Sequence, residues 1–182
     1  LDTQGIVLPV MMGPWGIDDN NDSVGQKSNA SLASMSLIWH CEFYKDQAFL
    51  EEYAYPYLLE LMNFWEDNLE FDEMGRCVIK GAQRERDPGD LNPGPTLGYV
   101  RKILEFMIPY SEDMGVERER RATWQNYLDH LSDYPVAVVD GKLLFKEAES
   151  RINISMFGKE DNPVMLDHVY PAGSLDKLGS ER

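Results

Sequence analysis

Apolar side chains recur at helical spacing along much of the chain, and turn-forming residues separate the repeats. From residue 27 to 44 they fall near every third or fourth position, with Ser28 or Asn29 before them as a candidate N-cap. This pattern predicts a first amphipathic helix that ends around Tyr44.

The next apolar positions predict two further helices. Phe49, Leu50 and Tyr53 indicate a short one. Pro56 suits the first turn of the next, because its missing N–H would be unpaired there in any case. The apolar face of this third helix continues to about Leu69.

Two more helices follow in the second half. Apolar residues recur at i, i+3, i+7, i+10 and i+11 from Leu97, which predicts a long amphipathic helix. Pro109 should bend that helix and Gly115 should end it. A last helix around Trp124 should stop before Tyr134 and Pro135.

Short strands complete the pattern. Residues 76–80 alternate between apolar and polar side chains after a turn at 72–75. Residues 136–139 and 142–145 are two β-prone runs joined by Asp-Gly, which strongly predicts a hairpin. We therefore expect a mainly α fold of paired antiparallel helices with short β-hairpins and long loops. No repeat of fixed period argues for a solenoid, and residues 1–182 are expected to form one domain.

The composition of the chain limits the classes of ligand that it is expected to bind. The 182 residues carry a formal net charge of −15, which disfavours nucleic acid and anionic membrane surfaces as partners. Neutral ligands, sugars among them, remain. No apolar run reaches the roughly 20 residues that span a bilayer. Two cysteines, Cys41 and Cys77, are expected to be buried free thiols.

No motif for a cofactor or metal is evident. The sequence lacks a phosphate-binding glycine loop, a G-x-S-x-G elbow, a paired CxxC and an HExxH pair. Asp18, Asn20 and Asp22 match the first ligands of a calcium loop, but Ser23 and Asn29 break the pattern at positions 6 and 12. We expect neither a cofactor nor a metal.

The most distinctive segment lies between the 76–80 strand and the long helix. The stretch 92–96, Asn-Pro-Gly-Pro-Thr, should be a stiff irregular turn because its two prolines fix φ, and Thr96 is a candidate cap. Just upstream, residues 83–87 bring acid, base and amide groups together. Glu85 there is a candidate general acid for glycoside cleavage, which needs a carboxylic acid to protonate the leaving oxygen.

A second interpretation of this cluster stays open, because runs of charged residues are usually solvated. The arginines beside Glu85 would lower its pKa if close, so desolvation by a bound sugar would have to raise it. Alternatively, Arg84 or Arg86 holds sugar hydroxyls and Glu85 orients them.

Other residues are candidate sugar contacts. Trp15 could stack on a sugar face, or it could fill the domain's own core. Asn92 and His168 could bond hydroxyl groups, although a histidine within an apolar patch is more often a core residue. His40 is expected to be structural, and His130 to be an exposed helical residue.

The order of several segments resembles the six-hairpin glycosidase superfamily. Its closest likeness is glycoside hydrolase family 95, which comprises inverting α-L-fucosidases and α-L-galactosidases. The matching segments are 37–50, 55–58, 92–96 and 168–171. The resemblance implies an (α/α)6 toroid whose loops form a sugar site at one end. It also implies a secreted or periplasmic location.

The chain departs from that family in three respects. In the family the acid glutamate follows a serine-proline pair, where this chain has Gln83-Arg84. The upstream asparagine pair and downstream aspartate that activate water have no clear counterpart. The chain is also too short for twelve barrel helices. It is therefore interpreted as the central fragment of a larger catalytic domain, the rest of which would be its partner.

Three functional hypotheses follow. The first is a glycoside hydrolase fragment with Glu85 as general acid and Trp15, Arg84, Asn92 and His168 as sugar contacts; the isolated chain is expected to show little or no activity. The second is a non-catalytic carbohydrate-binding module. The third is a helical scaffold whose acidic faces bind another protein.

Overall fold

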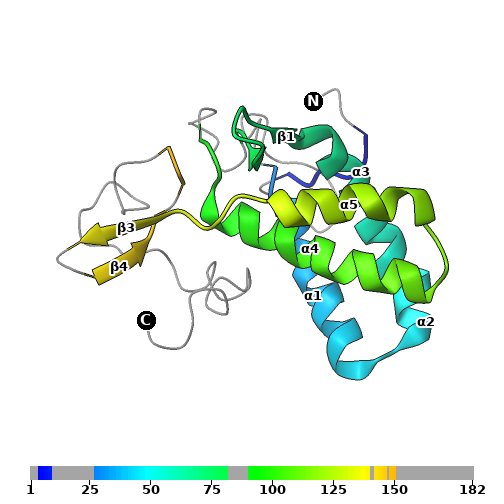
Figure 1. Cartoon of the computed structure of the whole chain (residues 1–182). Coiled ribbons are helices and arrows are strands. Elements are labelled where there is room, and N and C mark those ends of the chain that lie inside the picture. Colours follow the sequence, from blue (N-terminus) through cyan, green and yellow to red (C-terminus); the bar gives the residue numbers. More distant parts are fainter. Residues whose placement is uncertain (1–3, 10–26, 82–89, 140–141, 147, 151–182) are drawn as a thin grey trace.

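The protein is described here from a computed structural model, which places residues 4–9, 27–81, 90–139, 142–146 and 148–150. The described part is mainly helical, with two small antiparallel sheets (Figure 1). In chain order the elements are α1 (Asn29–Tyr44), α2 (Gln47–Phe49), the π-helical turn η1 (Leu50–Ala54), α3 (Tyr55–Asn68), β1 (Leu69–Phe71), β2 (Cys77–Ile79), α4 (Gly94–Asp113), α5 (Arg118–His130), β3 (Val136–Val139) and β4 (Lys142–Phe145).

The first helix forms where the apolar periodicity predicted it. α1 starts after Ser28, which takes the N-cap position without a side-chain hydrogen bond. It ends at Lys45, whose φ of 54° is left-handed and whose N–H donates to the carbonyl oxygen of Cys41. A residue in this conformation is a common helix end because it turns the chain while satisfying a last-turn carbonyl.

The short second helix and the third helix are present as α2 and α3, and Pro56 lies in the first turn of α3 as expected, but no break separates the two helices. Residues 47–68 are helical throughout, because η1 joins α2 to α3. Pro56 has no N–H and cannot donate to the carbonyl of Glu52 four residues before it. At this point the N–H of Tyr55 donates to the carbonyl of Leu50, five residues back, as in a π turn. The proline is therefore accommodated by a wider turn instead of a break in the helix.

The 76–80 strand is confirmed as β2, but its partner was not predicted. β1 pairs with β2 in antiparallel register, with Leu69 opposite Ile79 and Phe71 opposite Cys77. The expected turn at 72–75 connects them, and Gly75 there has a φ of 76°. The apolar spacing predicted that the preceding helix continues to Leu69, but Leu69 begins β1.

The long helix begins earlier than the sequence predicted. α4 starts at Gly94 after Pro93, so Thr96 lies inside its first turn. Thr96 is therefore not the N-cap that we expected. Pro95 fits this first turn, where a missing N–H costs no helical bond. Pro109 lies within α4, and Gly115 follows its end with a φ of 71°.

The core lies where α4 packs against the other helices. α4 runs beside α5 and also contacts α1 and α3 (Figure 1). The core is made of aromatic and aliphatic side chains. The largest fully buried ones include Phe64, Trp65, Leu61, Ile103 and Trp124. Burial of apolar side chains of this size stabilises a fold by about 1.5–3 kcal/mol each. This packing makes α4 the central helix of the described structure.

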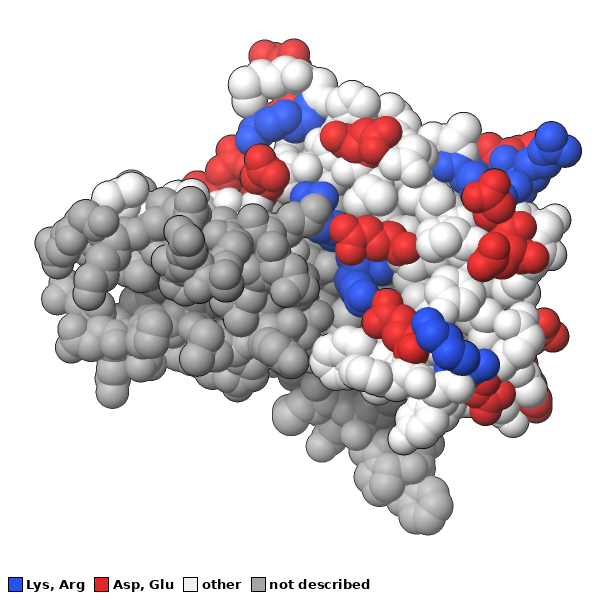
Figure 2. Space-filling model, turned by 60° about the horizontal axis from the view of Figure 1, so that its bottom comes forward, with Lys and Arg blue, Asp and Glu red and all other residues white. Residues whose placement is uncertain are grey.

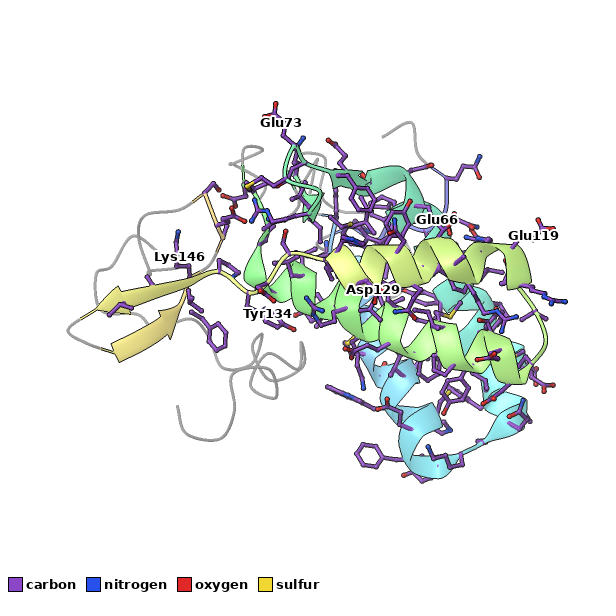
Figure 3. All side chains as sticks on the ribbon, viewed as in Figure 1. Glu66, Glu73, Glu119, Asp129, Tyr134 and Lys146 are labelled. Atoms are coloured by element: carbon purple, nitrogen blue, oxygen red, sulfur yellow. The ribbon has the colours of Figure 1, made fainter. Side chains whose placement is uncertain are left out.

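A polar network fastens α5 to α3 at the edge of that core. Glu66 is labelled in Figure 3. Its Oε1 accepts hydrogen bonds from the indole N–H of Trp124 and from Arg120, whose Nη2 lies 2.9 Å away. Arg120 also donates to the amide oxygen of Asn63 at 2.8 Å and to Glu117 at 3.2 Å. Its guanidinium lies over the Trp124 ring. The network satisfies the polar edge of a buried tryptophan.

The predicted β-hairpin is confirmed. β3 and β4 pair from Val136 opposite Phe145 to Val139 opposite Lys142. The hairpin extends away from the helices (Figure 1).

Surface charges of both signs lie close together on the face shown in Figure 2. Lys102 Nζ and Glu42 Oε1 form an ion pair at 2.7 Å. The thiols of Cys41 and Cys77 are buried and free, as the sequence predicted. Within the described residues, no helix is both long and apolar enough to cross a membrane.

Loss of the Glu66 carboxylate should destabilise the helical core. We expect Glu66→Gln to lower the free energy of unfolding by about 1.5–3 kcal/mol, because a charged acceptor shared by two donors is removed. Urea denaturation followed by tryptophan fluorescence would measure this. The control is Glu119→Gln, an exposed α5 carboxylate. Equal stability of the two variants would contradict the proposed role of Glu66.

Candidate functional site

The described residues on either side of positions 82–89 are hydrogen-bonded to each other. The N–H of Gly81 donates to the carbonyl of Asp90 at 2.7 Å, and the N–H of Asn92 donates to the carbonyl of Ile79 at 2.8 Å. Lys80 and Leu91 form an antiparallel bridge between them. We call residues 79–81 and 90–92 the root of the 82–89 segment. Glu85 therefore belongs to a segment that leaves and re-enters the described structure at adjacent points.

Asn92 is the central residue of the root. Its side chain is completely buried, and its backbone adopts a left-handed φ of 50°. Asparagine is one of the few residues that tolerate this conformation. Its Oδ1 accepts from the backbone N–H of Ile79 at 2.9 Å, and its Nδ2 donates to Glu149 Oε2 at 2.6 Å. The Asn92 side chain thus gives the N–H of Ile79, at the end of β2, its hydrogen-bond acceptor.

Glu149 is bound from a second side by Arg76. The guanidinium donates to both Glu149 oxygens, at 3.2 Å from Nη1 and 3.1 Å from Nη2, and its Nε donates to Asp72 at 2.9 Å. Asp72 also accepts from the backbone N–H groups of Met74 and Arg76. Arg76 therefore joins two carboxylates across the β1–β2 turn.

These contacts set the charge state of the cluster. Burial alone would raise the pKa of Glu149, but hydrogen bonds from Asn92 and Arg76 and the charge of Arg76 outweigh it and lower that pKa below its usual range. The pKa of Asp72 is lowered in the same way: desolvation opposes the shift, and the hydrogen bonds from Arg76 and Met74 together with the charge of Arg76 outweigh it. Both groups are thus held as carboxylates, which are acceptors and not proton donors.

A late segment of the chain completes the root. The N–H of Glu149 donates to the carbonyl of Leu91 at 2.9 Å, and the N–H of Leu91 donates to Ser150 Oγ at 3.0 Å. Ala148 forms a bridge with Pro93, directly before α4. The Nζ of Lys146, labelled in Figure 3, donates to the carbonyl of Glu149 at 2.8 Å. Residues 148–150 therefore lie beside Leu91 and Pro93, just before the start of α4.

The end of α5 is joined to β2 beside the root. Ser132 donates through both its N–H and its Oγ to the carbonyl of Cys77, at 3.0 Å each. The buried guanidinium of Arg101 on α4 donates to the carbonyls of Leu131 and Ser132. Burial raises the pKa of the Cys77 thiol to about 12. This thiol is consequently protonated near neutral pH and is not an activated nucleophile.

Of the five site residues predicted from the sequence, the structure describes one. Glu85, Arg84, Trp15 and His168 lie outside the described residues. Asn92 lies in the root, and both polar ends of its side chain are bonded within the chain.

Sequence reasoning missed Arg76 and Glu149. They are separated by 73 positions, and no periodicity or spacing relates them. The local signal was limited to the 72–75 turn, which did place Asp72 next to Arg76. The ion pair with Glu149 depends on tertiary structure.

The described residues contain no group of three or more histidine, cysteine, aspartate or glutamate side chains arranged to hold a metal ion. Comparison with protein-family models and with curated proteins found no match to this chain. The geometry of the root is therefore the main structural evidence on which a function can be proposed.

Replacing the Asn92 amide with a carboxylate should make the root unstable at neutral pH. In Asn92→Asp one oxygen can still accept from Ile79, but the other faces Glu149. Two carboxylates this close raise one pKa, so we expect unfolding free energy to fall by about 2 kcal/mol at pH 7. The loss should shrink as the pH falls through the raised pKa.

Urea denaturation at pH 7 and at about pH 5 would measure this difference. Asn126→Asp, at an exposed position of α5, is the control and should show little change at either pH. A loss in Asn92→Asp that does not depend on pH would contradict repulsion by Glu149.

The lowered carboxyl pKa values predict a specific pH dependence. A carboxyl whose pKa is lower in the folded state contributes stability above its unfolded pKa, near 4, and loses it as the pH falls through the folded pKa. Arg76→Gln should therefore reduce unfolding free energy at about pH 6, and the difference from the unmodified protein should vanish near pH 2. Lys80→Gln, which breaks the exposed pair with Glu70, is the control and should have little effect. A constant difference across this range would be the contrary result.

Proposed function

We propose that this chain is part of a glycoside hydrolase in which Glu85 is the general acid. In the intact protein it would protonate the leaving oxygen of a glycosidic bond, and water would attack with inversion. The second carboxyl, about 6.5–9.5 Å away in such enzymes, would come from elsewhere in the protein. The paired helices would form part of an (α/α)6 toroid.

The observation that carries this proposal is the construction of the root. A general acid must be held within hydrogen-bond reach of the leaving oxygen, and small displacements cost much of the rate. Backbone bonds from Gly81 and Asn92 join residues 79–81 to residues 90–92, which flank positions 82–89, and the Asn92 amide binds Glu149. A segment anchored in this way is suited to carrying a catalytic side chain.

The described structure changes the role proposed for Asn92. Because Oδ1 and Nδ2 are bonded to Ile79 and Glu149 and the side chain is fully buried, we assign Asn92 to positioning the root. Direct sugar contacts are proposed for Trp15, Arg84 and His168. The lowered pKa of Glu149 makes it a poor proton donor, so we propose the acid role for Glu85 and not for Glu149.

The test depends on the leaving group. In the intact protein, Glu85→Gln should lower kcat/KM by about 10²–10⁴ on aryl α-L-fucosides or α-L-galactosides with poor leaving groups, because these need protonation. On the corresponding glycosyl fluorides the loss of kcat/KM should be far smaller, because fluoride can leave without being protonated by a general acid.

The matched control is Glu73→Gln, an exposed carboxylate on the β1–β2 turn (Figure 3). It should leave both rates unchanged. An equal loss on both substrate types would contradict the acid role of Glu85. Saturable binding of glycans by the intact protein without any hydrolysis would instead favour a carbohydrate-binding module.

A further inference from the structure

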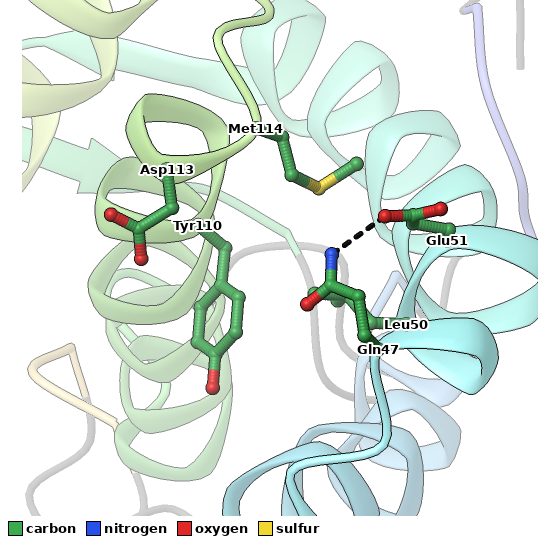
Figure 4. A pocket seen from close by; sticks show the side chains of 6 residues that line it. All are labelled: Gln47, Leu50, Glu51, Tyr110, Asp113 and Met114. Carbon is green, nitrogen blue, oxygen red and sulfur yellow. Dashed lines mark hydrogen bonds between the residues drawn. The ribbon is translucent and has the colours of Figure 1, made fainter.

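A cavity of about 290 Å³ lies where α2 and η1 face the end of α4. Six residues line it: Gln47, Leu50 and Glu51 on one side, and Tyr110, Asp113 and Met114 on the other (Figure 4). It is partly open to solvent. Its volume is at the lower end of the range for small-molecule sites, so a ligand of only a few heavy atoms would fit.

The cavity is at the opposite end of α4 from the root. α4 has 20 residues, and at 1.5 Å per residue the two ends are about 30 Å apart. The root precedes its first turn, whereas Tyr110 and Asp113 belong to its last. The cavity is therefore separate from the root.

The electrostatics of the cavity favour a cation. Glu51 and Asp113 place carboxylates at its edge, and none of its six lining residues is basic. The Gln47 amide donates to one Glu51 oxygen at 2.7 Å and orients that carboxylate (Figure 4). The carbonyl end of α4 adds the negative end of a helix dipole, with no basic residue in its last turn.

The remaining walls suit an alkylated cation better than a bare metal ion. The Tyr110 ring is stacked on Phe106 at a centroid distance of 4.2 Å and an interplanar angle of 18°, which restrains it. Met114 contributes a polarizable thioether, and the buried Leu50 an apolar surface. Aromatic rings attract alkylammonium groups through their negative faces, and apolar walls contact the attached carbon atoms.

The wide turn of η1 shapes one wall. Leu50 opens the π turn, and its carbonyl accepts from Tyr55, five residues later. Single π turns inside helices are often found at functional sites. Here the turn places Leu50 and Glu51 together on the cavity wall.

We propose that this cavity binds a free small molecule bearing an alkylammonium group. The two carboxylates and the α4 carbonyl end would neutralise the charge, and Tyr110, Met114 and Leu50 would contact the alkyl groups. Anionic ligands would be repelled by the same groups.

Butylammonium and tetramethylammonium are suitable probes, with butan-1-ol as the uncharged analogue. The reporter is the ¹³C-labelled methyl signal of Met114, assigned by its disappearance in Met114→Leu. We expect saturable shifts with a Kd of about 1–10 mM for the cations, and binding at least about tenfold weaker for butan-1-ol. Added salt should weaken cation binding.

Variants test the two carboxylates separately. Asp113→Asn and Glu51→Gln should each weaken binding about two- to fivefold, the range expected of exposed charge pairs. Glu52→Gln, a neighbouring exposed carboxylate that does not line the cavity, should bind normally. Far-ultraviolet circular dichroism would verify that each variant is folded.

Three results would each overturn the proposal: no saturable shift of Met114 up to about 50 mM cation, equal binding of butan-1-ol, or equal weakening by Glu52→Gln and Asp113→Asn. None of these results bears on Glu85, so the two proposals can fail independently.

Discussion

The buried amide of Asn92 is the constraint on which the candidate site depends. One side chain satisfies the N–H of Ile79 on β2 and the carboxylate of Glu149, and the same residue lies two positions before the start of α4. A buried donor or acceptor left without a partner costs about 1–3 kcal/mol. Removing this amide would leave both partners short of a bond, so the strand, the helix and residues 148–150 depend on it together.

The helices connect the root to the core of the protein. α4 starts at the root and packs against α1, α3 and α5. Arg101 of α4 bonds the carbonyls at the end of α5, and Glu66 fastens α5 to α3 through Arg120 and Trp124. Because each of these contacts crosses between elements, displacement of the root would require repacking of the core. The cavity at the far end of α4 is built on the same helix.

Local sequence patterns predicted the elements better than their connections. Apolar periodicity found α1, α4 and α5, and Asp-Gly found the β3–β4 hairpin, because these signals act over a few residues. The place of Pro56 in the first turn of α3 was predicted, but the π turn η1 that joins α2 to α3 was not. The bond from Asn92 to Glu149 spans 57 positions, and no local pattern encodes such a contact. The sequence predicted an irregular turn over 92–96, but residues 94–96 are the first turn of α4, and Asn92 is bonded inside the protein.

Amide hydrogen exchange tests the central claim most directly. The N–H groups of Ile79, Gly81 and Asn92 are all hydrogen-bonded within the root. If the root is a rigid anchor, these three amides should exchange as slowly as buried amides of α4, and Asn92→Ala should accelerate exchange at Ile79 while α4 stays protected. Fast exchange of all three in the unmodified protein, with the helices fully protected, would contradict the account.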